Sequence, residues 1–465
     1  METLQRAANR GSISTGYDID NSLKLEPLLG ERLYFTPASA GNRKTWTVSL
    51  WFKRTDDGYS MMFGTADTYV YLDTGGGAMH IRLDQSGLSG STYLYTTAQY
   101  MDSSAWYHFV LAVDTTQSTA SDRAKFYVNG VQETSFTTET YPTQNIDTDW
   151  NFTNAHYVGG WSGAAYDSAG YISEVHSVDG QQLDPTEFGE FDSDTGIWKP
   201  KAYTGTYGTN GFYLEFKNAA DLGDDTSGNN KNFVLSNITS ADQATDTPTN
   251  NFCTMTAFAN FYRYPKTENA VNGGTSVADS NVSNAWTGTM CTTPLFTGKW
   301  YWEVRMNQPS EQVCGIHDFN GNVGSNVNPY QVAGAQSWIV YGGGAYWLKS
   351  IDGTTTQGGT EGAFANGTIV GVALDLDNHL LTFYENGGSA GTNLTNIDIS
   401  SLTNVYPGPW MPFVGVFRNS LKTNFGGFPG FTISSGNADE NGYGNFEYAP
   451  PSGFLAICSK NLAES

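Results

Sequence analysis

The stretch TWTVSLWFK at residues 45–53 decides the fold class of this chain. Large apolar side chains recur at every second position, and polar side chains occupy the positions between them, except at Trp51. A period of two is typical of a β-strand that buries one face. The stretch therefore predicts a half-buried strand, whose core side chains are Trp46, Val48, Leu50 and Phe52.

Strand patterns continue through both halves of the chain. Residues 106–113, WYHFVLAV, are apolar on both faces, as in an inner strand of a layered sheet. Asn129-Gly130 separates two short strand-like runs, and this dipeptide favours the positive φ angles of a tight hairpin turn. Residues 301–306 and 369–376 alternate in the same way. We expect an all-β chain with two antiparallel β-sandwich domains of the jelly-roll kind.

The composition of residues 217–251, polar and rich in Asp, Asn, Ser and Thr, marks the boundary between the two halves. Residues 1–10 lack glycine and proline and predict a short helix or arm that needs a partner to be stable. The predicted organisation is an N-terminal attachment peptide at 1–20, a first sandwich at 21–216, a polar connector at 217–260, and a second sandwich with a C-terminal extension at 261–465.

Charge and composition exclude several classes of partner. The 465 residues include 46 Asp and Glu against 23 Lys and Arg, a net charge of −23 that repels nucleic acid. No run approaches the ~20 consecutive apolar residues of a spanning helix, so no membrane insertion is expected. The four cysteines form no C-x-x-C pair and are predicted to be reduced, buried thiols.

The catalytic motifs in the chain are incomplete. Residues 190–195, EFDSDT, come closest to the paired-carboxylate strand of jelly-roll glucanases but lack its last glutamate. The G-x-S-x-G string at 387–391 precedes a Thr/Asn-rich loop, whereas a nucleophile elbow requires a helix. The six histidines form no H-E-x-x-H motif. The sequence therefore predicts that the protein is not an enzyme.

Two groups of motifs carry family resemblances. The first comprises GNRKTWTVSLWFKR at 41–54, WYHFVLAVD at 106–114, AKFYVNGVQE at 124–133 and the segment 159–189. In order and spacing it resembles a concanavalin A-like jelly roll of the laminin-G type. The second comprises GKWYWEVRM at 298–306, GTIVGVALDLDNHLLTFYENG at 367–387 and LKTNFG at 421–426. This second group is similar to a SPRY domain of the B30.2 type.

The two domains in this order, joined through SGNNKNF and DTPTNNF and ending in YAPPSGFLAICSKNL, resemble a group of virion proteins from marine tailed phages. Such proteins are usually assigned as tail fibres or host-recognition components. The resemblance implies a place in the phage particle, assembly in the host cytoplasm, and contacts of the N-terminal segment with other virion proteins. It also implies a homo-oligomer; trimers are usual in such fibres, although no coiled-coil heptad here enforces one.

Aromatic side chains in glycine-rich segments are the candidate binding residues. A sugar ring has an apolar face and a rim of hydroxyls, which suits a Trp or Tyr ring beside Asp, Asn or Gln. The same rings would serve a protein contact, or they would fill the sandwich cores, above all Trp338 and Trp347. The candidates are Trp161, Tyr166 and Asp167 in the first half, and Tyr330, Trp338, Tyr341, Tyr346 and Trp347 in the second.

No cofactor is expected, with calcium as the one candidate ion. Laminin-G-like jelly rolls often hold calcium, and carboxylates are the ligands that this hard cation prefers. The candidate ligands lie in two acidic clusters, Asp192 with Asp194 and Asp224 with Asp225. Neither cluster has a recognisable ligand spacing. The alternative is that these residues belong to solvated turns.

These observations predict a non-enzymatic phage virion protein, a tail fibre or tail-tip component that binds a host-surface polysaccharide or an outer-membrane receptor. The alternative is a capsid decoration or tail-adaptor protein that contacts neighbouring virion subunits. A glycan hydrolase is disfavoured by the missing carboxylate pair.

Overall fold

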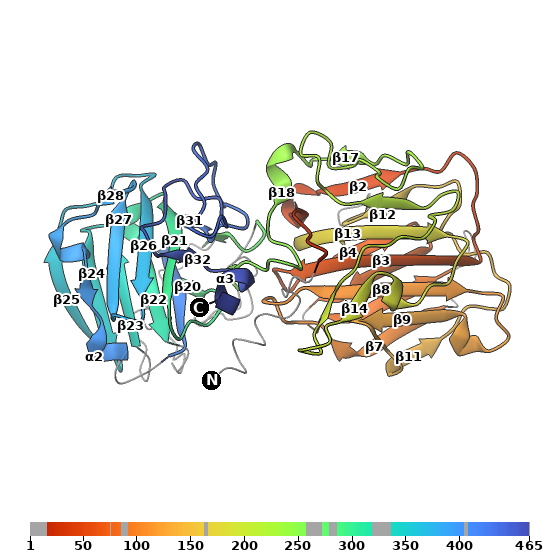
Figure 1. Cartoon of the computed structure of the whole chain (residues 1–465), viewed down its shortest axis with the longest axis horizontal. Coiled ribbons are helices and arrows are strands. Elements are labelled where there is room, and N and C mark those ends of the chain that lie inside the picture. Colours follow the sequence, from red (N-terminus) through yellow and green to blue (C-terminus); the bar gives the residue numbers. More distant parts are fainter. Residues whose placement is uncertain are drawn as a thin grey trace. The chain divides into compact units, whose positions relative to one another are not determined.

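The computed structural model describes residues 16–74, 76–84, 92–161, 166–256, 272–278, 286–318, 336–403 and 408–464. Within these residues strands dominate and helices are short, which confirms the predicted all-β class. The described residues form two compact units, an N-terminal unit that ends at Asn251 and a C-terminal unit that starts at Phe252 (Figure 1). Most of the predicted attachment peptide, residues 1–15, lies outside the described residues.

The first sheet of the N-terminal unit is built around β3 (Thr45–Arg54). This strand pairs antiparallel with β8 (Tyr107–Asp114) and β13 (Gly170–Asp179). Its side chains Trp46, Val48, Leu50 and Phe52 face the core, as predicted. The order across the sheet is β10-β9-β8-β3-β13-β1-β18, with β16 also paired to β13. The other strands are β1 (Ser22–Leu25), β9 (Ala124–Val128), β10 (Val131–Gln132), β16 (Phe212–Leu214) and β18 (Gln243–Ala244).

The second sheet of this unit packs on the other side of the same core. Its strand order is β11-β7-β6-β5-β4-β12-β2-β17. The strands are β2 (Arg32–Phe35), β4 (Ser60–Gly64), β5 (Thr68–Leu72), β6 (Ala78–Leu83), β7 (Tyr93–Gln99), β11 (Phe136–Thr140), β12 (His156–Val158) and β17 (Val234–Ser236). The two sheets face each other, so their outer faces point in opposite directions.

The predicted hairpin turn is confirmed. Asn129 and Gly130 join β9 to β10 with φ angles of 48° and 79°. Positive φ at both central residues is the geometry that Asn-Gly was expected to supply.

A segment after β13 covers the outer face of the first sheet. It contains the 3-10 turn η3 (Pro185–Glu187) and the hairpin of β14 (Gly189–Phe191) with β15 (Trp198–Pro200). Asp184 caps η3, because its carboxylate accepts a hydrogen bond from the Thr186 N–H at 3.1 Å. Trp51 points outward beneath this cover and is buried. Of the other outward side chains of β3, Thr47, Ser49 and Lys53 are buried too, so the strand is buried on both faces and the prediction of a half-buried strand is wrong.

Residues 217–251, which the sequence placed in the connector, pack within the N-terminal unit. β17 and β18 extend its two sheets, and Lys24 and Lys53 form buried ion pairs with Asp242 (2.8 Å) and Asp246 (2.7 Å). The remaining 3-10 turns of this unit are η1 (Pro27–Leu29), η2 (Ala120–Asp122) and η4 (Ser240–Asp242).

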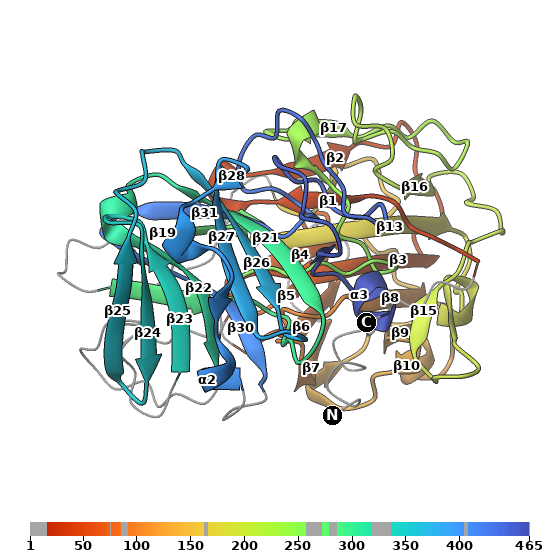
Figure 2. The same ribbon diagram turned by 60° about the vertical axis from the view of Figure 1, so that its left-hand side comes forward.

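The C-terminal unit is a second sandwich. One sheet has the order β19-β31-β21-β26-β27-β28, with β29 paired to β27 and β32 parallel to β21; the other has the order β20-β30-β22-β23-β24-β25. Figure 2 shows β25, β24, β23 and β22 side by side. The first sheet contains β19 (Ser276–Ala278), β21 (Lys299–Met306), β26 (Ile369–Asp375), β27 (Leu380–Glu385), β28 (Gly388–Ser389), β29 (Ile397–Asp398), β31 (Ser420–Asn424) and β32 (Leu455–Ala456). The second contains β20 (Trp286–Met290), β22 (Gln312–Asp318), β23 (Gln336–Tyr341), β24 (Tyr346–Ile351), β25 (Thr354–Thr360) and β30 (Trp410–Phe417).

Helical structure in this unit is confined to short pieces. These are η5 (Pro309–Glu311), η6 (Thr392–Leu394), α2 (Ser400–Thr403) and α3 (Ser459–Glu464). None of the described helices of the chain is long and apolar enough to cross a membrane. The four cysteines are buried and unbridged, as expected.

Candidate functional site

The outer face of the second sheet of the N-terminal unit is unusually aromatic. Along β5, Val70 and Leu72 point into the core, so Tyr69 and Tyr71 point outward. The same alternation turns His80 and Arg82 of β6, and Tyr93 and Tyr95 of β7, to the outer face. An outer sheet face usually carries small polar and charged side chains. Here it presents rings from three adjacent strands.

These rings contact one another across the strands. Tyr71 stacks on His80 with ring centroids 4.7 Å apart and planes 10° apart. The opposite neighbour of His80 is Tyr95, at 3.8 Å, and Tyr69 lies 5.8 Å from Tyr71. The result is a continuous row of aromatic side chains rather than isolated rings.

Two residues predicted from the sequence join this row from a loop. Trp161 lies 5.7 Å from Tyr69, and Tyr166 lies 5.1 Å from Tyr71, both measured between ring centroids. The buried carboxylate of Asp167 accepts a hydrogen bond from the Trp161 N–H at 3.1 Å. Asp167 therefore holds the backbone of Trp161. We call this surface the tyrosine face: Tyr59, Tyr69, Tyr71, His80, Arg82, Tyr93, Tyr95, Trp161 and Tyr166.

Charged groups are interspersed with the rings of the tyrosine face. The Tyr95 hydroxyl donates to Asp73 at 2.9 Å, and His80 Nε2 lies 3.5 Å from the same carboxylate. Arg82 donates to Asp84 at 2.7 Å. The guanidinium also lies 5.5 Å from the Tyr69 ring centroid, close enough for a cation–π interaction.

Burial sets the protonation of the tyrosine face. It lowers the pKa of His80, although the neighbouring Asp73 acts in the opposite direction. It raises the pKa of Tyr71 and of Tyr69. At neutral pH the imidazole and phenols are therefore uncharged, and Arg82 supplies a fixed positive charge.

The tyrosine face combines groups that are suited to binding a ligand. Its rings offer apolar faces, and phenol hydroxyls, carboxylates and a guanidinium lie beside them. That combination matches the apolar face and hydroxyl rim of a sugar. Tyr, Trp and Arg are also the residues enriched at the centres of protein interfaces.

Four of the five candidate residues of the C-terminal unit lie on β23 and β24. Trp338 is buried, with 4% of its surface exposed, and its ring centroid lies 5.1 Å from that of Trp347. Tyr341 and Tyr346 are paired opposite each other with ring centroids at 5.2 Å. Trp347, Tyr341 and Tyr346 are half-buried against the core. The remaining candidate, Tyr330, lies outside the described residues.

The candidate metal ligands are held by their own loops. Asp192 accepts hydrogen bonds from the Thr195 N–H at 2.9 Å and the Asp194 N–H at 3.1 Å, and the Thr195 bonds hold the pKa of Asp192 at about 2. Asp225 accepts from the N–H groups of Tyr213 and Lys231 at 2.8 and 2.7 Å. Asp194 is exposed, and Asp224 lies beside Asp225. Within the described ranges, no group of three or more His, Cys, Asp or Glu side chains could hold a metal ion.

Comparisons with protein families agree with the two folds. The family model of the concanavalin A-like lectin/glucanases superfamily, in its laminin-G form, matches residues 31–187. The SPRY domain model matches residues 299–428. The chain carries a laminin-G/concanavalin A-like domain and a SPRY domain. No curated protein matches the chain.

Several solved structures are similar to parts of the chain. A candidate carbohydrate-binding protein from Bacteroides ovatus is 12% identical, with 48% of this chain and 59% of that one covered and a TM-score of 0.33. This chain thus spans less than two thirds of that protein's length. The SPRY domain of human HERC1 is 13% identical, with 32% and 87% covered and a TM-score of 0.24. A heptameric SAP-like pentraxin from Limulus polyphemus is 16% identical, with 36% and 80% covered and a TM-score of 0.26.

Of the residues that form the tyrosine face of the laminin-G domain, the sequence predicted only Trp161 and Tyr166. The available signal was the alternation within 68–72, 78–83 and 93–99, where rings and charges occupy the positions opposite the core residues. The sequence could not show that these three strands are neighbours, or that the loop carrying Trp161 lies against them. The pairing of β5 with β6 and of β6 with β7 supplies this information.

Proposed function

We propose that this protein is a non-enzymatic virion component of a tailed phage, which recognises a host-surface glycan through the tyrosine face of its laminin-G domain. The observation that carries the glycan assignment is the row of contacting rings from Tyr69 to Tyr95, flanked by Asp73 and Arg82. The phage setting rests on the resemblance described from the sequence. That resemblance supports a role in a tail fibre or tail tip.

Recognition at such a surface depends on several weak contacts. The accessible parts of the rings would contact apolar faces of the sugars, and the neighbouring charged groups would set which hydroxyl pattern fits. In a homo-oligomer several copies would bind together, and linked sites raise the effective concentration without new contacts. The N-terminal segment would attach the protein to other virion subunits.

The second candidate function is a decoration or adaptor protein of the particle. The composition of the tyrosine face also supports this role, since Tyr, Trp and Arg concentrate at protein interfaces. In that case the rings would be covered by a neighbouring virion subunit rather than by a sugar.

Binding of the labelled, purified protein to intact host cells tests the proposal, with and without periodate oxidation of surface sugars. We expect saturable binding that is lost after periodate, and no release of reducing sugar from host envelopes during incubation. Binding that survives periodate would assign recognition to a protein receptor. No binding by folded protein would favour the decoration or adaptor role, and sugar release would contradict the non-enzymatic assignment.

A further inference from the structure

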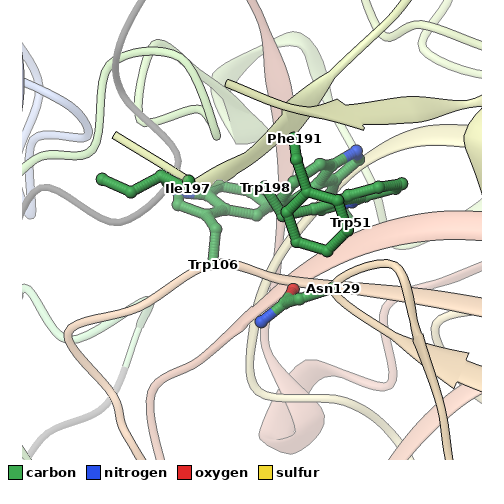
Figure 3. A pocket seen from close by; sticks show the side chains of 7 residues that line it. Trp51, Trp106, Asn129, Phe191, Ile197 and Trp198 are labelled. Carbon is green, nitrogen blue, oxygen red and sulfur yellow. The ribbon is translucent and has the colours of Figure 1, made fainter. Parts of the chain in front are cut away.

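The laminin-G domain has a second aromatic site, on the face opposite the tyrosine face. A cavity of about 290 Å³ lies on the outer side of the first sheet (Figure 3). It opens beside the hairpin of β14 and β15. The residues that line it are Trp51, Trp106, Asn129, Phe191, Gly196, Ile197 and Trp198. We call it the tryptophan pocket.

Hydrogen bonds and close packing fix the tryptophan rings of this pocket. Trp198 Nε1 donates to His108 Nδ1 at 3.0 Å, and Trp106 Nε1 donates to the buried Asp246 at 3.0 Å. Trp51 stacks on His108 with ring centroids 4.7 Å apart. Because these rings are held before any ligand arrives, little side-chain entropy would be lost on binding.

Glycines make room for the central ring. A Cβ atom at Gly130 or Gly189 would overlap the Trp198 side chain. Trp198 is therefore inserted between the β9–β10 turn and the start of β14. Glycine at both positions therefore leaves the space that the Trp198 indole occupies next to the cavity.

The entrance of the tryptophan pocket is apolar and exposed. Phe191 is 52% exposed, whereas Trp51, Trp106 and Trp198 are each at most 6% exposed. The Phe191 and Trp198 rings meet edge to face, with centroids 4.8 Å apart (Figure 3). An exposed phenylalanine beside a cavity offers an apolar contact that a ligand could cover.

The lining determines which ligand fits. No charged side chain lines the described pocket, so an ionic ligand would lose hydration without gaining an ion pair. Asn129 Oδ1 accepts the backbone N–H of His108 at 2.8 Å, so the amide nitrogen is the group of this side chain that could donate to a ligand. The volume is just under the roughly 300 Å³ at which drug-sized pockets begin, which suits one six-membered ring.

We propose that the tryptophan pocket binds a single neutral pyranose ring, with the apolar face of the sugar against the exposed Phe191 ring at the entrance and an oxygen of the sugar accepting from Asn129. The proposal does not depend on the tyrosine face, because the two sites occupy opposite faces of the laminin-G domain and share no residue.

Ligand-detected saturation-transfer NMR on the full chain tests this proposal. The probes are neutral hexoses (glucose, galactose, mannose and N-acetylglucosamine), with glucuronic acid as the charged comparison. Phe191→Ala removes the exposed ring at the entrance, and Ile197→Trp fills the cavity. Val234→Ala, at a side chain that is 51% exposed on β17, is the matched control.

We expect at least one neutral hexose to bind and glucuronic acid to bind more weakly. Phe191→Ala should weaken the binding about tenfold, Ile197→Trp should abolish it, and Val234→Ala should leave it unchanged. Binding that persists in both pocket variants and is lost in Trp161→Ala would overturn this proposal while supporting the tyrosine face. Absence of binding by every neutral hexose to folded protein would also overturn it.

Discussion

The indole nitrogen of Trp198 donates a hydrogen bond to Nδ1 of His108 at 3.0 Å. An accepting Nδ1 requires the proton of a neutral imidazole to lie on Nε2, which is 2.8 Å from the Ser49 hydroxyl. His156 shows the opposite tautomer, because its Nε2 accepts the Asn151 N–H and its Nδ1 lies 2.9 Å from the Asn154 carbonyl. Both buried histidines are thus held in neutral forms.

Acid should therefore destabilise the laminin-G domain. Burial lowers the pKa of His108 from 6.5 to about 3 and that of His156 to about 4. The unfolded chain binds protons at these histidines more readily than the folded chain does. The stability that the two neutral histidines contribute is therefore fully present above pH 6.5 and is lost as the pH falls below it. At pH 5 each histidine should cost about 2 kcal/mol of unfolding free energy. Calorimetric melting between pH 7.5 and 4.5 measures this loss.

A histidine variant separates this effect from general acid denaturation. Gln in place of His156 can still accept from Asn151 and donate to Asn154, but it does not titrate in this range. His156→Gln should melt lower than the wild type at pH 7.5 and lose less stability on acidification. Equal acid sensitivity in the two proteins would contradict the assignment.

The sequence predicted the two sandwiches because their core strands have a clean period of two. It predicted the Asn129-Gly130 turn because that turn depends on neighbouring residues alone. It did not place residues 217–251 in the first unit, since Asp242 and Asp246 find their lysine partners about 200 residues earlier in the chain. The tyrosine face was missed for the same reason: single outward residues become a site only through strand pairing.

Replacing Trp161 should weaken recognition without unfolding the laminin-G domain. Trp161 is half-buried on a loop, so Trp161→Ala removes one ring of the tyrosine face and few contacts of the core. We expect a loss of host-cell binding of about tenfold, typical of a central aromatic contact. Phe152→Ala, at another half-buried loop ring, is the control. Trp347→Ala tests the SPRY domain in the same assay. Undiminished binding by both tryptophan variants would contradict recognition through these aromatic side chains.

Gly358 of β25 should tolerate no side chain while Trp347 is present. A Cβ atom there would overlap the Trp347 indole, which covers the glycine from the neighbouring strand. Gly358→Ala should cost about 1–3 kcal/mol, a typical penalty for overpacking. Gly388→Ala is the control, because a Cβ at that position meets its nearest atom at 3.5 Å. In urea unfolding, the double variant Gly358→Ala with Trp347→Ala should lose less than the sum of the single losses.

Chelation should leave the melting temperature of the laminin-G domain unchanged. The carboxylates of Asp192 and Asp225 already accept hydrogen bonds from their own loops, so the turns are held without a cation. Melting with EDTA, and again after addition of calcium, checks this. A melting temperature that falls with EDTA and recovers with calcium would establish a structural calcium site instead.

Asp246 should be the most sensitive position of the segment after residue 217. Its carboxylate accepts from Lys53 Nζ at 2.7 Å and from Trp106 Nε1 at 3.0 Å, and both Lys53 and Asp246 are at most 1% exposed. Asp246→Asn leaves a buried ammonium without its counter-charge, which typically costs 3–5 kcal/mol, whereas replacing both partners removes the charge imbalance. The variant Asp246→Asn should therefore unfold at a much lower urea concentration, and Lys53→Met with Asp246→Asn should recover part of the loss. If the double variant is less stable than Asp246→Asn alone, the ion pair is not what holds this segment to the first sheet.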